Sequence, residues 1–143
     1  MEDEVGYPRI RNVVLDCANP RESAEFYRLL FGLMYRRGDE PPGEGRPDPK
    51  GDDWLVLRNP SGFGLSFQKV ENLTPPTWPE ATVPQQLHLD TSVPTRRALE
   101  AQHRRAIGLG ARVLYDRSDD PQEPLRVYAD PSGHPFCIFV APD

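Results

Sequence analysis

The side chains with the greatest chemical capacity in this sequence are its three histidines and two cysteines. His88 and Asp90 alternate within an apolar segment, so a β-strand would place the imidazole and the carboxylate on the same face. An imidazole in this position can bind a metal ion or a small-molecule ligand. A lone histidine on an apolar strand is also typical of a hydrogen-bonded core or pocket residue, and both interpretations stay open for His88.

The two cysteines are expected to be reduced, because they are too few for a disulfide framework. Cys17 and Cys137 are not expected to meet. Cys137 lies in an apolar run and is interpreted as a small buried residue, with a nucleophile as the alternative. The sequence has no nucleophile-elbow serine, phosphate-binding glycine loop, dinucleotide fingerprint or Cys-x-x-Cys pair. An acid/base pair of Asp16 and Asp90 would depend on the fold bringing them together.

Composition narrows the range of partners. A formal net charge of −5 argues against general nucleic-acid binding. The longest apolar runs are far shorter than a membrane span, and the acidic start Met1–Glu4 is unlike a signal peptide. With 37% hydrophobic residues, the 143-residue chain can bury the core of one domain, residues 1–143. We therefore expect a cytoplasmic protein with a small-molecule ligand and with neither a nucleic-acid nor a membrane partner.

The elements that must position these side chains follow one order in the first half of the chain. Residues 11–17 are short and rich in β-branched residues, which predicts a strand. Asn19, Pro20 and Glu22 then form the start signal of a helix, and Gly32 forms its stop signal. Further strands are predicted over residues 33–37, 54–58 and 64–70. The first half therefore reads as βαβββ.

The second half repeats this order. Strands are predicted over residues 86–93, 112–115, 125–129 and 136–140, with a helix from Pro94–Thr95 to Gly108 or Gly110. Asn-Pro-Ser-Gly at 59–62 and Asp-Pro-Ser-Gly at 130–133 turn the chain at equivalent places. This internal repeat predicts module one at 10–70, a Pro-rich connection at 71–84 and module two at 85–141.

Two segments resemble the vicinal oxygen chelate superfamily, which holds glyoxalases, extradiol dioxygenases, fosfomycin-modifying enzymes and bleomycin-binding proteins. Residues 12–27 with Phe31-Gly32-Leu33 are similar to the first strand and helix of a first module. Residues 128–136 are similar to the final turn and strand of a second module. Residues 74–79 and 85–90 are similar to small bacterial glyoxalase-like proteins. The resemblance implies an α+β fold, in which two βαβββ modules pair into a cup-shaped mixed β-sheet with helices on the outside.

The resemblance also implies a divalent metal ion, held by one ligand from the first strand and one from the last strand of each module. The corresponding positions are Asn12, Ser66, His88 and Cys137, of which only His88 is a good ligand. Gln68 shares a strand face with Ser66 and is a substitute ligand. Two hypotheses therefore remain: a metal site formed by His88 and Gln68 with Cys137, and a cup that holds no metal.

Two tryptophans indicate an apolar ligand surface. Trp54 lies beside a loop-rich segment, and Trp78 lies in the connection, where it would cover a bound molecule or fill the seam between modules. We expect a cup lined by Asn12, Gln68, His88, Asp90, Cys137, Trp54 and Trp78 that binds a small organic molecule, with pockets at the interface of a homodimer. The alternatives are a metal-dependent lyase or dioxygenase with His88 as an ion ligand, and an interaction domain whose cup is filled by side chains.

Overall fold

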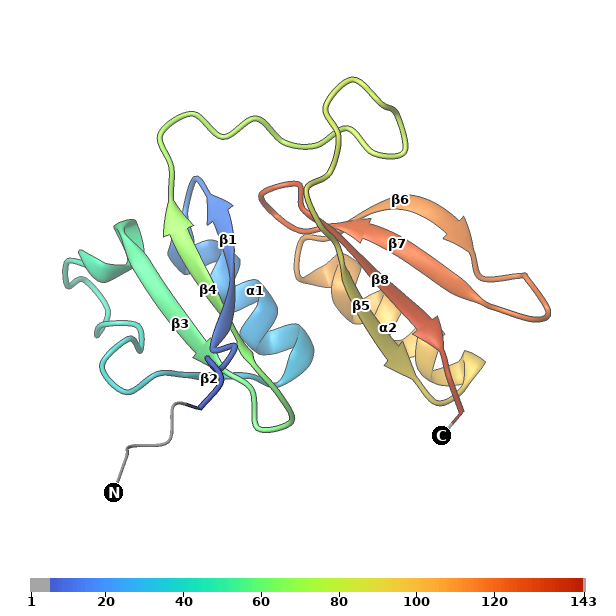
Figure 1. Ribbon diagram of the computed structural model, residues 1–143, viewed down its shortest axis with the longest axis horizontal. Coiled ribbons are helices and arrows are strands. Elements are labelled where there is room, and N and C mark those ends of the chain that lie inside the picture. Colours follow the sequence, from blue (N-terminus) through green and yellow to red (C-terminus); the bar gives the residue numbers. More distant parts are fainter. Residues whose placement is uncertain (1–5, 143) are drawn as a thin grey trace.

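Each half of the chain folds into a helix and a four-stranded sheet in the computed structural model, which describes residues 6–142 (Figure 1). The acidic start Met1–Glu4 lies outside the described residues. Module one contains β1 (Asn12–Cys17), α1 (Pro20–Phe31), β2 (Met34–Tyr35), the 3-10 helix η1 (Lys50–Asp52), β3 (Trp54–Arg58) and β4 (Gly64–Lys69). Module two contains β5 (Leu89–Val93), α2 (Arg96–Gly108), β6 (Arg112–Arg117), β7 (Leu125–Ala129) and β8 (Pro135–Val140).

The two sheets have the same topology, which confirms the repeat predicted from the sequence. The strand orders are β1-β4-β3-β2 and β5-β8-β7-β6, and in each sheet the first and last strands of the module pair in parallel. Val14 lies opposite Ser66 in module one, as Asp90 lies opposite Cys137 in module two. The eight strands form two mixed sheets side by side rather than a closed barrel (Figure 1). The α+β fold of paired βαβββ modules is therefore confirmed.

Local signals set the ends of the helices. The Asn19 side chain accepts a hydrogen bond from the Glu22 backbone N–H at the start of α1, and Thr95 does the same for Ala98 at the start of α2. Gly32 ends α1 with φ of 67°, a left-handed conformation that glycine adopts without a Cβ clash. The caps at Asn19 and Gly32 were predicted from the sequence, and for α2 the sequence predicted the start of the helix at Pro94–Thr95.

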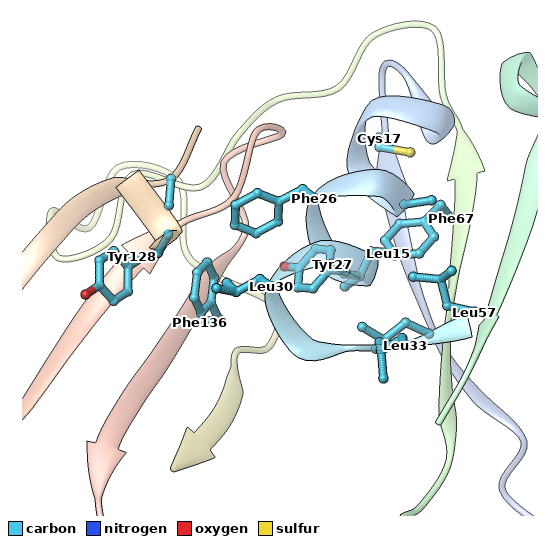
Figure 2. Close-up of a cluster of buried hydrophobic side chains, with 14 of the residues drawn as sticks. Leu15, Cys17, Phe26, Tyr27, Leu30, Leu33, Leu57, Phe67, Tyr128 and Phe136 are labelled. Atoms are coloured by element: carbon cyan, nitrogen blue, oxygen red, sulfur yellow. The ribbon is translucent and has the colours of Figure 1, made fainter. Parts of the chain in front are cut away.

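The core runs continuously from one module into the other. In Figure 2, Phe26, Tyr27 and Leu30 of α1 lie between Phe136 of β8 and the apolar face of the module-one sheet. The Phe26 and Phe136 ring centroids are 5.7 Å apart, and the Tyr27 hydroxyl donates to Asp130 Oδ2 at 2.7 Å. Both Tyr27 and Phe136 are fully buried. The side chains of α1 therefore join the two halves through one hydrophobic core.

Two strands are shorter than predicted by more than one residue. The strand expected over 33–37 spans only β2, although the Arg36 backbone N–H still donates to the Val56 carbonyl at 2.9 Å. The strand expected over 86–93 begins at Leu89, so His88 comes immediately before β5. The neighbouring strand β8 begins with Pro135, which has no N–H to donate to a ladder. Neither helix in the described part of the chain is long and apolar enough to cross a membrane.

Each helix covers one face of its sheet and leaves the other face open. α1 packs on β3 and β4, and α2 packs on β5 and β8. Along β1 the side chains alternate, with Leu15 and Cys17 buried beneath α1 and Val14 and Asp16 exposed on the other side. The open faces are the places where side chains are available to a ligand.

Candidate ligand-binding pocket

The open face of module two holds a pocket of about 290 Å³. Its walls come from β5, β7 and β8, and the connection closes one side. The lining residues are Trp78, Gln85, His88, Asp90, Glu123, Leu125, Val127, Cys137 and Phe139. Strand alternation explains the set, because Leu125 and Val127 of β7 and Cys137 and Phe139 of β8 point away from α2.

Carboxylates dominate the polar part of the pocket. His88 Nε2 lies 3.2 Å from Asp90 Oδ1, and both side chains are about half exposed or more, at 49% and 63%. Glu123 also lines the pocket, and its charge is partly offset by the Arg117 guanidinium, which lies 3.0 Å from Glu123 Oε2. The pocket thus offers hydrogen-bond acceptors and negative charge beside one imidazole, which favours a ligand with N–H groups or positive charge.

The Cys137 thiol faces this pocket but is kept neutral. Burial raises its pKa to about 11, and the Asp90 and Glu123 carboxylates add to the shift because they oppose a nearby thiolate. The residue is only 7% exposed. A thiol in this state is a poor nucleophile and a poor metal ligand at neutral pH, so Cys137 supplies a small apolar surface.

The connection contributes an aromatic ring to the pocket, and the first residue of module two contributes an amide. Trp78 packs edge-on against Tyr115 of β6, with ring centroids 6.2 Å apart. The Gln85 Oε1 atom is buried and has no hydrogen-bond partner within residues 6–142. The sequence analysis did not single out Gln85, although it lies in the 85–90 segment on which the family resemblance rests. An unpaired buried acceptor beside a pocket is a position where a ligand donor would be stabilising.

The structure brings together four of the seven side chains expected to line the cup. Trp78, His88, Asp90 and Cys137 share the module-two pocket. The other three belong to module one and do not line it. Trp54 and Gln68 lie opposite each other in β3 and β4, and Asn12 lines a different pocket at the start of β1.

The donor atoms do not fit the divalent metal ion that the family resemblance implies. Asn12 and Ser66 are neutral, and the Ser66 hydroxyl is fully buried with no hydrogen-bond partner among the described residues. Within residues 6–142, no group of three or more His, Cys, Asp or Glu side chains is placed to hold a metal ion. Gln68 does not line either of the pockets that His88 lines. A metal site needs several correctly spaced donors, and the described residues do not supply them.

Comparison with known proteins places the fold. A family model described as "Glyoxalase-like domain" matches residues 12–139. No curated protein matches the chain. A glyoxalase/bleomycin resistance protein/dioxygenase family enzyme from Burkholderia phytofirmans is 16% identical, with 93% of this chain and 98% of that chain covered and a TM-score of 0.67.

Two further solved structures share the fold at low identity. A glyoxalase/dioxygenase from Nostoc punctiforme is 19% identical over 100% of both chains, with a TM-score of 0.67. The fosfomycin resistance protein FosX from Mesorhizobium loti is 8% identical over 99% of this chain and 94% of that chain, with a TM-score of 0.63. Since the family model covers most of the sequence and the paired βαβββ fold agrees with it, the chain belongs to the glyoxalase-like domain family.

Proposed function

We propose that the module-two pocket binds a small planar organic molecule that carries N–H donors, and that it does so without a metal ion. The observation that supports this most directly is the convergence of Trp78 and Phe139 with Asp90, Glu123 and the unpaired Gln85 Oε1 atom. Aromatic and aliphatic walls supply apolar contact, while a few acceptors set orientation. This proposal favours binding or sequestration over catalysis.

The charge of the pocket defines the preferred ligand. Asp90 attracts a cation, and Gln85 accepts a hydrogen bond from a neutral or charged N–H group. Benzamidine combines a planar ring, a positive charge and two donor groups, so it is a suitable probe. We expect it to raise the melting temperature more than uncharged benzamide, and benzoate to have the smallest effect.

Substitution of Asp90 tests whether the module-two pocket causes the preference for benzamidine over benzamide and benzoate. Asp90→Asn should weaken benzamidine binding about tenfold, which corresponds to ~1.4 kcal/mol. Asp119→Asn is the matched control, because Asp119 is an exposed loop carboxylate outside the pocket. Equal affinities in the two variants, measured by calorimetry, would contradict the assignment of the pocket.

The rival function is a metal-dependent lyase or dioxygenase with His88 as an ion ligand. Elemental analysis of wild type and His88→Ala, both purified without chelator, decides between binding without a metal and metal-dependent catalysis. We expect no stoichiometric metal in either protein. One metal ion per chain that disappears in His88→Ala would overturn binding without a metal and support the rival.

We further propose that the protein acts as a cytoplasmic homodimer, with no nucleic-acid or membrane partner. Large apolar side chains on the surface of both modules support the dimer, among them Met34 at 64% and Phe63 at 50% exposed. Light scattering after size-exclusion chromatography should give about twice the chain mass of 16.2 kDa. A single species at the chain mass over the accessible concentration range would exclude the dimer.

A further inference from the structure

A second pocket, on module one, is lined by four arginines although the chain as a whole is acidic. This arginine pocket has a volume of about 410 Å³ and contains Arg9, Arg11, Arg36 and Arg58. The formal charge of the chain is −5, so the local excess of positive charge is opposite in sign to the whole molecule. The arginine pocket shares no lining residue with the module-two pocket. It is therefore a separate feature that the proposed function does not use.

Local backbone geometry keeps the floor of the arginine pocket open. Gly64 begins β4, and its backbone N–H donates to the Arg11 carbonyl at 3.0 Å. A Cβ at Gly64 would lie 2.2 Å from the Leu57 carbonyl oxygen and 3.0 Å from Asn12 Oδ1. Only glycine allows this approach, and it leaves the Asn12 amide at the pocket floor.

One of the four arginines is held by an internal carboxylate. Arg36 lies 3.1 Å from Asp39, which is 1% exposed and also accepts a hydrogen bond from the Val56 N–H at 2.9 Å. This contact orients the Arg36 guanidinium and offsets its charge.

The other three arginines carry the positive charge of the pocket. Among residues 6–142, no carboxylate lies within salt-bridge distance of Arg9, Arg11 or Arg58. All three are exposed at the pocket. Guanidinium groups bind carboxylate and phosphate oxygens in a bidentate manner, so this charge favours an oxyanion.

An apolar pocket adjoins the arginine pocket. It lies along the seam between the modules and has a volume of about 600 Å³. It shares Asn59 and Phe63 with the arginine pocket, and His88 and Asp90 with the module-two pocket. Its apolar lining includes Val13, Phe31, Leu33, Leu65, Leu87 and Leu89. Phe63 is 50% exposed although it is a large apolar ring, which places contact surface at the junction of the two pockets.

We propose that the arginine pocket binds the oxyanion head of an amphipathic small molecule, whose apolar body lies across Phe63 in the seam pocket. A carboxylate and a phosphate share the required chemistry, because both present oxygen pairs to guanidinium groups. The apolar body is favoured because the seam pocket removes it from water. The ligand is thus opposite in charge to the one proposed for module two.

The test compares four probes by isothermal titration calorimetry. They are 4-phenylbutyrate, 3-phenylpropyl phosphate, the uncharged 4-phenylbutyramide and inorganic phosphate. Both charged aryl-alkyl probes should bind at least about tenfold more tightly than the amide, and binding should weaken as salt rises to ~0.5 M. The stronger of the two anions identifies the preferred head group. Inorganic phosphate should bind more weakly than the phosphate ester, because it lacks the apolar body.

Variants locate the site. Arg58→Gln and Arg11→Gln should each raise the dissociation constant of the anions about tenfold, since each removes a charged hydrogen-bond donor. Arg97→Gln removes the same charge from an exposed position on α2 and is the matched control. Equal affinities for the amide and the anions, or equal effects of Arg58→Gln and Arg97→Gln, would overturn the proposal.

Amide chemical shifts separate this proposal from the module-two function. The anions should perturb the resonances of residues 9–12 and 58–64, and also those of 87–91, because the latter line the seam pocket. Benzamidine should perturb the resonances of 85–90 and 123–139 and leave those of 9–12 and 58–64 unchanged. Anions that perturb 85–90 and 123–139 but not 9–12 and 58–64 would refute the arginine site and leave module-two binding intact. Loss of benzamidine binding with retention of the anion response would refute the module-two function alone.

Discussion

The two modules share a backbone but differ in the charge of their open sheet faces. In module one the face carries Arg58 at the end of β3, next to Arg9 and Arg11, and in module two it carries Asp90 and Glu123. The strand pairing is equivalent in both, since Trp54 lies opposite Gln68 as Leu125 lies opposite Phe139. The repeat therefore determines where side chains point, while their chemistry has diverged.

On the sheet faces covered by the helices, it is module two that carries an arginine and module one that carries an apolar residue. Arg126 of β7 lies on the face covered by α2, where it is 8% exposed and contacts Glu100 at 2.9 Å and Asp116 at 3.1 Å. The equivalent position of module one is Leu55, which is buried in the apolar core. Module two thus neutralises its arginine internally, whereas module one leaves arginines available at its open face. A buried arginine needs partners, and an exposed one can bind a ligand.

The largest expected effect comes from the equivalent core positions Phe136 and Leu65. Phe136→Ala should lower the free energy of unfolding by about 4 kcal/mol, and Leu65→Ala by about 2 kcal/mol, measured by urea denaturation. The reason is that Phe136 contacts rings from both modules, including Phe26 at 5.7 Å between centroids. Equal losses would show that the modules are not joined mainly through Phe136.

The next effect concerns the start of the last strand, where module one has Gly64 and module two has Pro135. Gly64→Ala should lower the free energy of unfolding by about 2 kcal/mol. The cause is the Cβ contact at 2.2 Å with the Leu57 carbonyl oxygen. Gly62→Ala serves as the control, because its nearest atom is 4.0 Å away. Similar stabilities for the two variants would contradict the close approach of β4 to β3.

The cysteines provide a chemical comparison of the two modules. The pKa of each thiol is raised to about 11 by burial, so alkylation should be slow at pH 7 and rise about tenfold per pH unit toward pH 11. Cys137 faces a pocket, whereas Cys17 is 0% exposed beneath α1. Mass spectrometry after iodoacetamide treatment should therefore find Cys137 modified first, and benzamidine should protect it. Faster modification of Cys17 in the folded protein would contradict the placement of Cys17 beneath α1 and of Cys137 at the pocket.

The smallest effect is the pH dependence of the Arg126 network. Hydrogen bonds from Ser118 and the Arg126 guanidinium lower the pKa of Asp116 to about 2, below its usual value of 3.8. A lowered folded-state pKa stabilises the protein above pH 4, and this contribution is lost as pH falls from 4 to 2. Asp116→Asn should cost less than ~1 kcal/mol at pH 7, because the side chain is half exposed. The difference from wild type should disappear near pH 2 in thermal melts, and a constant difference would exclude Asp116 as the titrating group.

Much of the fold could be predicted because its signals are local. The caps at Asn19 and Gly32, the alternation in β1 and the matched Pro-Ser-Gly turns each depend on a few neighbouring residues. The early end of β2 and the late start of β5 were missed, because strand ends depend on the partner strand. Pro135 at the start of β8 belongs to a segment far from His88 in sequence.

The candidate site was predictable only in part, for a related reason. The sequence placed Trp78, His88, Asp90 and Cys137 on suitable segments, but it also assigned Asn12, Gln68 and Trp54 to the same cup. Whether two modules share one cavity depends on how their sheets are placed relative to each other. Gln85 and the arginine pocket were missed because a buried unpaired acceptor and a cluster of charges from distant segments have no local signature.

The sequence by itself determined the order of elements, the repeat, the helix ends and the side-chain alternation, because backbone propensities and hydrophobic period act over a few residues. Only the tertiary structure decided that the open faces form separate pockets of opposite charge. Pockets and fields arise from residues that are distant in the chain, and their positions follow from strand pairing within each module rather than from any local pattern.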